Sequence, residues 1–180
     1  SDVKLTLDAD LCKTAYEALG GKKGAVVVYN YKTGAVLCEV STPSFDPGAP
    51  PADLDTDETG KYEGVYLNNV LSSTYTPGSV FKVVTTAAAI ENIPDLDSRT
   101  FTCNGSVVIN GNQINCLATH GQIDFKTALS HSCNVVFGEL AVELGEEKMT
   151  EMANQMGFNT SFEFDGIHTA KSVYRVKGAS

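Results

Sequence analysis

The chain has 180 residues, of which 42% are hydrophobic and 19% are charged, and its formal net charge at pH 7 is -9. This size and composition suit one globular domain with a hydrophobic core, and the acidic balance argues against a nucleic acid or an anionic membrane surface as partner. No stretch is long and apolar enough to span a bilayer, and no signal peptide opens the sequence, so we expect that an export signal or membrane anchor lay upstream.

The first third of the chain indicates a strand, a helix and a hairpin. Residues 3–7 alternate apolar and polar side chains like a short strand, and residues 8–19 have the apolar spacing of a capped helix. Residues 25–29 and 35–40 have the pattern of two buried strands joined by a tight turn. Residues 48–61 gather prolines, glycine and acids without periodicity, which predicts a surface loop with solvated carboxylates.

The most informative stretch surrounds Ser79. Pro77 and Gly78 break the chain, a helix can begin at Ser79, and apolar residues then fill nearly every side of that helix as far as Ile90. We therefore expect this helix to be buried. Lys82 follows Ser79 by three residues, so the two side chains share one helical face and lie within hydrogen-bonding reach.

This serine and lysine can form an activated nucleophile. Burial disfavours the charged form of Lys82, so its pKa would fall, and a neutral amine could take the proton of the Ser79 hydroxyl. Backbone N–H groups of the first helical turn lie beside the serine and could stabilise an oxyanion after it attacks an acyl carbon. The alternative without chemistry is a helix-capping serine and a lysine whose amine reaches the surface.

A second group of residues could bind a metal ion. Residues 101–121 are expected to form a hairpin around an Asn-Gly turn, with a cysteine on each arm, a histidine at its end and a third cysteine beside the next helix. Three thiolates and one imidazole are a tetrahedral set that structural zinc favours, although the spacing is not that of a standard finger. The alternative is a disulfide between Cys103 and Cys116 in an exported protein. The four candidate ligands are Cys103, Cys116, His120 and Cys133.

Two short helices are expected next, over residues 124–129 and 135–144, and Gly145 ends the second. Ser132 and Asn134 lie between them, flanking a cysteine. Taken alone, this pair indicates only a helix N-cap and a polar neighbour.

The end of the chain predicts one more helix over residues 146–156, with Met149, Met152 and Met156 on its core side, and one more strand over residues 172–176. The chain has five cysteines, an odd number, so they cannot all pair with one another. Two cysteines outside the candidate metal group have the character of small core residues, namely Cys12 and Cys38.

Three segments together resemble one enzyme family. Residues 75–82, YTPGSVFK, closely resemble the nucleophile motif of the penicillin-binding proteins, the serine transpeptidases that cross-link bacterial peptidoglycan. Residues 132–134, SCN, resemble the family's second motif, S-x-N, and residues 24–47 resemble its first hairpin. Residues 32–34, KTG, match the letters of its third motif, but that motif lies on a strand far C-terminal to the nucleophile. Since these residues precede Ser79, we assign them to a turn.

The resemblance implies an α/β (α+β) fold of the β-lactamase/transpeptidase type, represented mainly by the helical lobe and the N-terminal hairpin of the central sheet. It covers nearly the whole chain but only about the N-terminal half of a complete domain. Residues 1–180 would then be a partial penicillin-binding transpeptidase domain without the C-terminal part that carries the K-T-G strand, and we expect it to be weakly active or inactive alone. The implied location is the extracytoplasmic face of a bacterial membrane, with attachment through the upstream anchor only.

The resemblance also implies a role for each motif residue. Ser79 would attack the penultimate D-alanine carbonyl of a peptidoglycan stem peptide with Lys82 as general base, Ser132 would join the proton path, and Asn134 would bond to the lysine and the substrate. β-Lactams would acylate the same serine, and catalysis needs no cofactor. Some members of the family hold zinc at the place of the cysteine and histidine group, so a structural zinc is implied as the alternative to the disulfide. Other cell-wall synthesis proteins are further expected partners, and nucleic acid is not.

Two other functions remain open at this stage. A serine β-lactamase-like hydrolase shares the first two motifs but needs a base that activates water for rapid deacylation, and no carboxylate motif clearly supplies one. The other is a non-enzymatic, zinc-stapled module that docks in a cell-wall assembly, in which Ser79 is only a helix cap.

Overall fold

The computed structural model describes residues 2–164 and 166–176. Within these ranges the chain forms two compact units. The first extends to Thr74 and includes Ser161–Ala170, and the second consists of Tyr75–Thr160 and the segment that starts at Lys171. Helices and small antiparallel sheets occur together, which confirms the expected α/β class.

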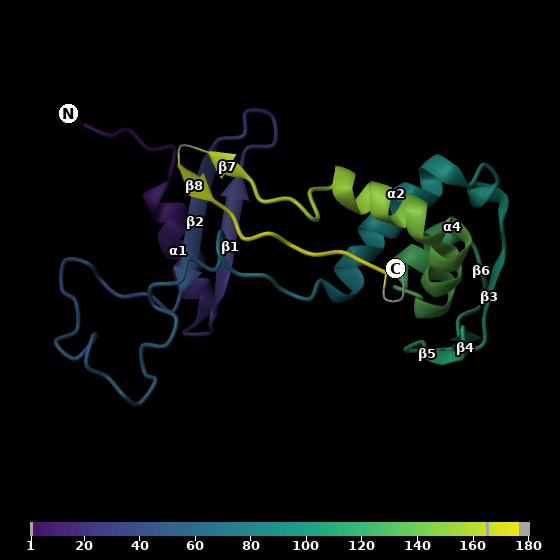
Figure 1. Cartoon of the computed structure of the whole chain (residues 1–180), viewed down its shortest axis with the longest axis horizontal. Coiled ribbons are helices and arrows are strands. Elements are labelled where there is room, and N and C mark those ends of the chain that lie inside the picture. Colours follow the sequence, from purple (N-terminus) through teal and green to yellow (C-terminus); the bar gives the residue numbers. More distant parts are fainter. Residues whose placement is uncertain (1, 165, 177–180) are drawn as a thin grey trace. The chain divides into compact units, whose positions relative to one another are not determined.

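The first unit is a helix packed along a two-stranded antiparallel sheet (Figure 1). Helix α1 (Ala9–Leu19) begins at Asp8, whose carboxylate accepts a hydrogen bond from the Leu11 N–H at 3.0 Å. Strand β1 (Gly24–Tyr29) pairs with β2 (Val36–Thr42), so the predicted hairpin is confirmed. The core between helix and sheet consists of Ala15, Cys38 and Val40, with Cys12 packed against them, as expected for both cysteines.

The strand predicted at residues 3–7 is wrong. These residues have no β pairing, and the side chains of Val3 and Leu5 are exposed. Alternation of apolar and polar residues misleads here because a strand also needs a partner for its ladder hydrogen bonds. A short antiparallel pair elsewhere in this unit, β7 (Glu163–Phe164) with β8 (Ile167–His168), carries no such alternation.

The predicted loop is confirmed, and its acids do more than face solvent. Residues 43–74 contain no helix or strand. The carboxylates of Asp53 and Asp55 accept hydrogen bonds from the hydroxyls of Tyr62 and Tyr66, at 2.7 Å and 2.8 Å. These contacts join distant parts of the loop, so the acids organise its backbone.

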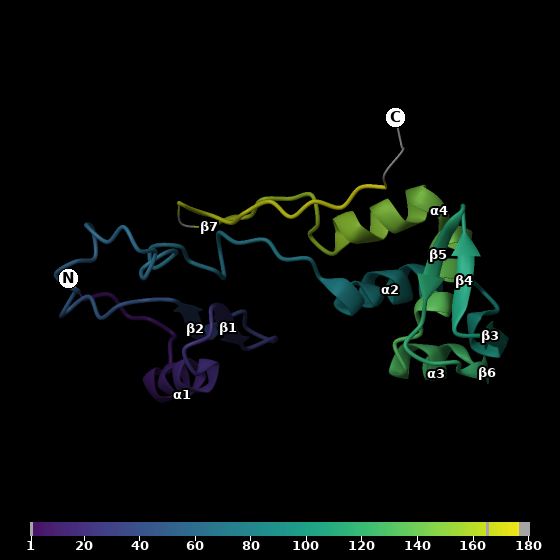
Figure 2. The same ribbon diagram turned by 90° about the horizontal axis from the view of Figure 1, so that it is seen from below.

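Two helices form the centre of the second unit, where they lie side by side (Figure 2). A 3-10 turn, η1 (Gly78–Phe81), leads into α2 (Lys82–Asn92), which packs along α4 (Asn134–Gln155). Helix α4 is interrupted at Gly145, which has φ 73° and ψ 175°, so the predicted break at this glycine is confirmed. Buried residues of both helices form the core, including Val84, Ala88, Ala89, Val136, Leu140 and Leu144.

Several short elements lie between α2 and α4 in the sequence. Their bounds are η2 (Leu96–Ser98), β3 (Phe101–Cys103), β4 (Ser106–Ile109), β5 (Asn112–Asn115), β6 (Gly121–Ile123) and α3 (Phe125–Ser130), and β3, β4 and β5 contact α4. The Asn-Gly turn joins β4 to β5, with positive φ angles of 49° at Asn110 and 78° at Gly111. However, Cys103 lies on β3, which pairs with β6, and Cys116 follows β5. The two cysteines therefore flank the hairpin. The prediction that they lie on its two arms is wrong.

Helix α2 is buried on one side only, although the sequence predicted burial all round. Val84 and Ala88 lie in the core, whereas Val83 is 57% exposed and Ile90 is 64% exposed. The exposed side of α2 is apolar too, and packing within the described part of this unit does not explain why. A second expectation also changes, because the helix is preceded by a 3-10 turn and Ser79 lies inside that turn, so it is not the N-cap.

The last predicted elements are confirmed in part. Met149 and Met152 are buried in the second half of α4, but Met156 is 42% exposed because the helix has ended there. Residues 172–176 form no strand. They are held instead by Asn159, whose backbone N–H donates to the Ser172 carbonyl at 3.0 Å.

Candidate active site

The 3-10 turn places Ser79 next to Lys82. Gly78 has φ 55°, a left-handed conformation that glycine adopts readily, and it allows the chain to enter the turn. Ser79 is exposed, and the Lys82 amine lies 3.2 Å from its hydroxyl oxygen. The predicted pair is therefore within hydrogen-bonding distance, although the backbone between the two residues is a 3-10 turn and not an α-helix.

The S-x-N segment meets the same amine from the other side. Lys82 Nζ donates to the Ser132 hydroxyl and to the Ser132 carbonyl, both at 2.8 Å, and to Asn134 Oδ1 at 2.7 Å. Ser132 has φ 51°, an uncommon conformation for a residue with a side chain. This bend lies between α3 and α4 and turns both polar groups of Ser132 toward the lysine. All four residues singled out for catalysis thus come together.

Burial shapes the charge of the lysine. The pKa of Lys82 is lowered because burial penalises the ammonium form, and negative charge on Cys116 and Cys133 only partly opposes this effect. The Phe137 ring lies 5.6 Å from the amine and contributes to the apolar wall. A larger share of neutral amine is therefore present at a given pH than for a lysine in water, as a general base requires.

The hairpin orients Asn134, a contact that sequence reasoning missed. The side-chain amide of Asn134 donates to the Asn115 carbonyl at 2.9 Å, and its backbone N–H donates to Cys116 Sγ at 3.4 Å. Because Nδ2 is engaged by Asn115, the amide oxygen Oδ1 faces Lys82. No side-chain pattern could have indicated this contact, since its acceptor is a backbone carbonyl.

The predicted cysteine and histidine group also comes together. The ligand atoms of Cys103, Cys116, His120 and Cys133 lie within 4.8 Å of one another. Cys116 Sγ is 3.6 Å from His120 Nδ1 and 3.8 Å from Cys133 Sγ. Four ligands placed about 2.3 Å from a central zinc ion in a tetrahedron would stand about 3.8 Å apart. The donor set and its spacing therefore fit zinc.

The thiols of this group differ in acidity. Although burial opposes ionisation, N–H donors of Asn134 and Ala118 bring the pKa of the Cys116 thiol down to about 6, whereas burial raises that of Cys133 to about 11. All five cysteines carry free thiols in the structure. The ring of His131, to which the sequence gave no role, lies 5.2 Å from that of His120.

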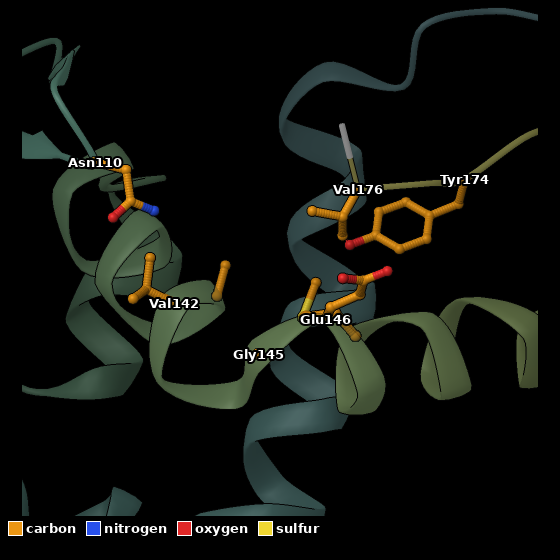
Figure 3. A pocket seen from close by; sticks show the side chains of 8 residues that line it. Asn110, Val142, Gly145, Glu146, Tyr174 and Val176 are labelled. Atoms are coloured by element: carbon orange, nitrogen blue, oxygen red, sulfur yellow. The ribbon is translucent and has the colours of Figure 1, made fainter. Parts of the chain in front are cut away.

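Two other features lie away from these residues. The K-T-G letters at residues 32–34 occupy the turn between β1 and β2, where Gly34 has φ 75°, as their assignment to a turn predicted. A hollow of about 370 Å³ lies at the kink of α4, lined in part by Glu146 and Tyr174 (Figure 3). Neither Lys82 nor the three residues that its amine contacts line it, so the catalytic candidates and the hollow are separate features of this unit.

The fold and this set of side chains have the arrangement that a serine acyl-transfer site requires, with a lysine amine in reach of a serine hydroxyl. Residues 24–179 match the sequence model of the penicillin binding protein transpeptidase domain. The chain therefore belongs to the family of penicillin-binding transpeptidases.

Curated relatives agree with this assignment. The chain is 29% identical to the peptidoglycan D,D-transpeptidase PbpA of Mycolicibacterium smegmatis, in a match that covers 88% of this chain and 36% of that protein. It is 30% identical to the stage V sporulation protein D of Bacillus subtilis, with 91% and 26% covered. The chain thus spans about a quarter to a third of the length of these relatives.

Solved structures share the fold. The D,D-transpeptidase domain of a peptidoglycan glycosyltransferase from Eggerthella lenta superimposes with a TM-score of 0.87 at 32% identity, over 96% of this chain and 42% of that one. Penicillin-binding protein A of M. tuberculosis, in its penicillin G acyl-enzyme complex, gives a TM-score of 0.69 at 25% identity, over 86% and 40%. In the described residues, no helix combines the length and apolar character needed to cross a membrane.

Proposed function

We propose that the protein to which this chain belongs cross-links peptidoglycan stem peptides through an acyl-enzyme on Ser79. The observation that carries this proposal is the position of the Lys82 amine, 3.2 Å from the Ser79 hydroxyl and 2.8 Å from that of Ser132. An amine that contacts two hydroxyls can take a proton from one and return it through the other. The names of the relatives, which include peptidoglycan D,D-transpeptidases, support the same substrate.

The first half-reaction forms the acyl-enzyme. Ser79 Oγ bonds to the carbonyl carbon of the penultimate D-alanine, its proton passes to neutral Lys82, and the carbonyl electron pair moves to the oxygen. The backbone N–H of Ser79, in the 3-10 turn, is the proposed donor to this oxyanion. The bond to the terminal D-alanine then breaks, and its nitrogen receives the proton from Lys82 through the Ser132 hydroxyl.

The second half-reaction transfers the acyl group. An amine of a neighbouring stem attacks the ester carbon and gives its proton to Lys82, and Ser79 Oγ leaves and regains a proton. A β-lactam would acylate the same oxygen by opening its ring, and in that case no leaving group departs. Neither half-reaction requires a cofactor. Such a reaction would take place on the extracytoplasmic face of the membrane, where other cell-wall synthesis proteins are the expected partners.

Residues 1–180 would supply only part of the site. The family's third motif binds the substrate carboxylate and provides a second oxyanion donor, and the only K-T-G in this sequence lies in the turn at residues 32–34. We therefore propose that this chain is a partial transpeptidase domain and that it is weakly active or inactive by itself.

Labelling with a fluorescent penicillin tests the proposal. The intact protein should form a covalent adduct that survives denaturing electrophoresis, and Ser79→Ala should abolish it, whereas a change at the exposed Ser72, Ser72→Ala, should not. Peptide mass spectrometry should place the adduct on Ser79. Labelling of Ser79→Ala at the rate of the parent would disprove the proposal and favour a docking module in which this serine is structural.

The lifetime of the adduct separates a transpeptidase from a β-lactamase-like hydrolase. A hydrolase needs a general base to activate water, and among the described residues the hydrogen bonds of Lys82 lead to Ser79, Ser132 and Asn134 and to no carboxylate. We therefore expect the penicilloyl adduct to persist far longer than the acylation step takes. Release as fast as acylation would favour the hydrolase.

We also propose that Cys103, Cys116, His120 and Cys133 hold a structural zinc ion. The mutual separation of their ligand atoms, within 4.8 Å, supports this assignment. Three thiolates and one imidazole would fill a tetrahedral shell and leave no open position, so the ion would contribute to stability and not to the reaction.

Metal analysis and thiol counting test the zinc site together. Protein purified without chelator should contain one zinc per chain, and its thiols in this group should react with a thiol reagent only after chelation. Thermal unfolding should shift to lower temperature when zinc is removed. A metal-free protein with a Cys103–Cys116 bridge in its peptide map would establish the disulfide instead.

A further inference from the structure

An aromatic cluster lies directly behind the nucleophile turn. Phe81 is the residue before Lys82, and its ring packs against two rings that are distant in sequence. The Phe158 ring meets it edge-on, with centroids 5.4 Å apart and an interplanar angle of 83°. The Tyr174 ring stacks on it, with centroids 5.1 Å apart and an angle of 16°. Phe81 is thus held by one residue that follows α4 and one near the end of the described chain.

Hydrogen bonds fix the segment that carries Tyr174. The Asn159 backbone N–H donates to the Ser172 carbonyl at 3.0 Å, and the Tyr174 N–H donates to Asn159 Oδ1 at 2.9 Å. Asn159 itself has φ 60°, a left-handed conformation that asparagine tolerates better than most residues. The segment therefore lies in a defined position against the helices, although it forms no strand.

Tyr174 contacts Phe81 with its ring and also borders a hollow. This is the hollow of about 370 Å³ at the kink of α4, which Glu146 and Val176 also line (Figure 3). Burial, and after it the charge of Glu146, raise the pKa of the Tyr174 phenol, so its ring is neutral when it stacks on Phe81. Because the hollow offers no dense packing, Tyr174 keeps its place through Phe81 and Asn159.

Phe81 is the residue of this turn whose side chain packs against the core. A 3-10 turn has poorer hydrogen-bond geometry than an α-helix and is used in short pieces. Its bond from the Val80 N–H to the Pro77 carbonyl is 3.2 Å long, and the side chain of Val80 is exposed. Phe81 is therefore the apolar anchor of a turn that also contains Ser79.

We propose that Tyr174 is a positioning residue for Ser79. By stacking on Phe81, opposite the edge contact from Phe158, it fixes the 3-10 turn and so keeps the Ser79 hydroxyl in reach of Lys82. Tyr174 does not touch the reacting atoms, and it acts through Phe81. This inference rests on the proposed acylation of Ser79.

Acylation kinetics of the intact protein test it. With a chromogenic cephalosporin, the noncovalent dissociation constant and the acylation rate constant can be measured separately for Tyr174→Phe, Tyr174→Leu and Tyr174→Ala. Displacement of a reacting group by about 1 Å can cost about 10²-fold, so the Leu and Ala variants should lose about tenfold or more in the rate constant. Their dissociation constants should change little, and the Phe variant, which keeps the ring, should acylate like the parent.

The controls separate positioning from folding. Val173→Ala, a change at a 67% exposed neighbour in the same segment, should leave both constants unchanged. Thermal unfolding shows whether each variant folds, and if Tyr174→Ala does not fold, the Leu variant decides. Parent-like acylation by Tyr174→Leu, or an equal loss in Tyr174→Phe, would overturn the proposal. If the parent protein itself takes up no cephalosporin, the proposed function fails, which is a distinct result.

Discussion

At the scale of single residues, the site depends on how many oxygen atoms surround one amine. Lys82 Nζ has acceptors on Ser79, on Ser132 and on Asn134, all within 3.2 Å. These oxygens hold the side chain in place, and the Ser79 and Ser132 hydroxyls can also donate to the amine when it is neutral, while burial disfavours its charged form. Position and basicity of the lysine therefore have separate origins, and substitutions can separate them.

Replacing Lys82 by arginine should test its role as a base. Arginine keeps the positive charge and the capacity to donate to Ser132 and Asn134, but it does not deprotonate in proteins. We expect Lys82→Arg and Lys82→Met to lower the acylation rate constant by similar factors, about 10²–10⁴ as is typical of a lost general base. Stopped-flow measurement with a chromogenic cephalosporin provides the rate. The exposed Lys126→Met serves as the control, and retention of activity in the arginine variant would contradict the assignment.

The pH dependence of acylation should report the same lysine. Because a lysine that acts as the proposed general base must be neutral, the rate should rise with pH and level off above the pKa of Lys82. Burial lowers that pKa, so the midpoint of the rise should lie below the 10.5 of an ordinary lysine. Rates measured across a pH series with one penicillin give the midpoint. A rate that falls with increasing pH would mean that the ammonium form is required.

At the scale of elements, the hairpin of β4 and β5 connects the core to the site. Gly138 on α4 faces this hairpin, and a Cβ atom there would stand 3.0 Å from the Ile114 side chain and 3.1 Å from that of Ile109. The hairpin ends at Asn115, whose carbonyl receives the Asn134 amide. Close packing at the glycine therefore sets the distance between α4 and the residue that orients Asn134.

Filling this contact should move the hairpin. Gly138→Ala places one methyl group against two flexible isoleucine tips, and the helix gains about 1 kcal/mol in propensity, so its stability should change little. Gly138→Val adds two more methyl groups and should cost about 1–3 kcal/mol through overpacking. Chemical denaturation of both variants measures this difference, and their acylation rates show whether Asn134 has moved. If Gly138→Ala and Gly138→Val are equally stable, the hairpin moves away from the larger side chain without a cost in free energy of unfolding.

The elements that the sequence predicted well are those with local causes. Asp8 caps α1, the Asn-Gly turn makes a hairpin, and Gly145 interrupts a helix, all through interactions within a few residues. Residues 3–7 and 172–176 were predicted as strands wrongly, because a strand depends on a partner elsewhere in the chain. The sequence therefore located turns and caps better than strand pairing.

The same distinction holds for the site. The spacing of Ser79 and Lys82 predicted their contact, and the family's motif pointed to Ser132 and Asn134, so all four could be named from the sequence. The contact of Asn134 with the Asn115 carbonyl could not be predicted from the sequence, because every residue has a backbone carbonyl. The stack of Tyr174 on Phe81 was equally hidden, since it joins positions 93 residues apart through an irregular segment.

At the scale of the whole molecule, the chain matches only part of the length of its relatives. It spans 36% of PbpA from M. smegmatis and 42% of the solved domain from E. lenta. The residues around Lys82 all lie in the second unit, as does the group of three cysteines and one histidine. This unit thus brings together the proposed nucleophile, base and metal ligands, whereas the one K-T-G of the sequence lies in the turn between β1 and β2.

The isolated chain should therefore react slowly with penicillin. Loss of one oxyanion donor alone typically costs about 10²–10³ in rate, and the missing contacts to the substrate carboxylate should weaken binding further. We expect residues 1–180 to be acylated at least about 10²-fold more slowly than the intact protein. Time courses of penicillin labelling compare the two, with thermal unfolding as the control for folding. Equal rates would show that these residues suffice for acylation.

Cys133 belongs to two structures at once. It is fully buried among the ligand atoms of the cysteine and histidine group, and it is also the residue between Ser132 and Asn134. On the proposed function, a substitution of Cys133 that slows acylation by a β-lactam would also remove one of the four candidate metal ligands. Resistance should therefore arise through substitutions around the S-x-N segment that leave its middle residue unchanged.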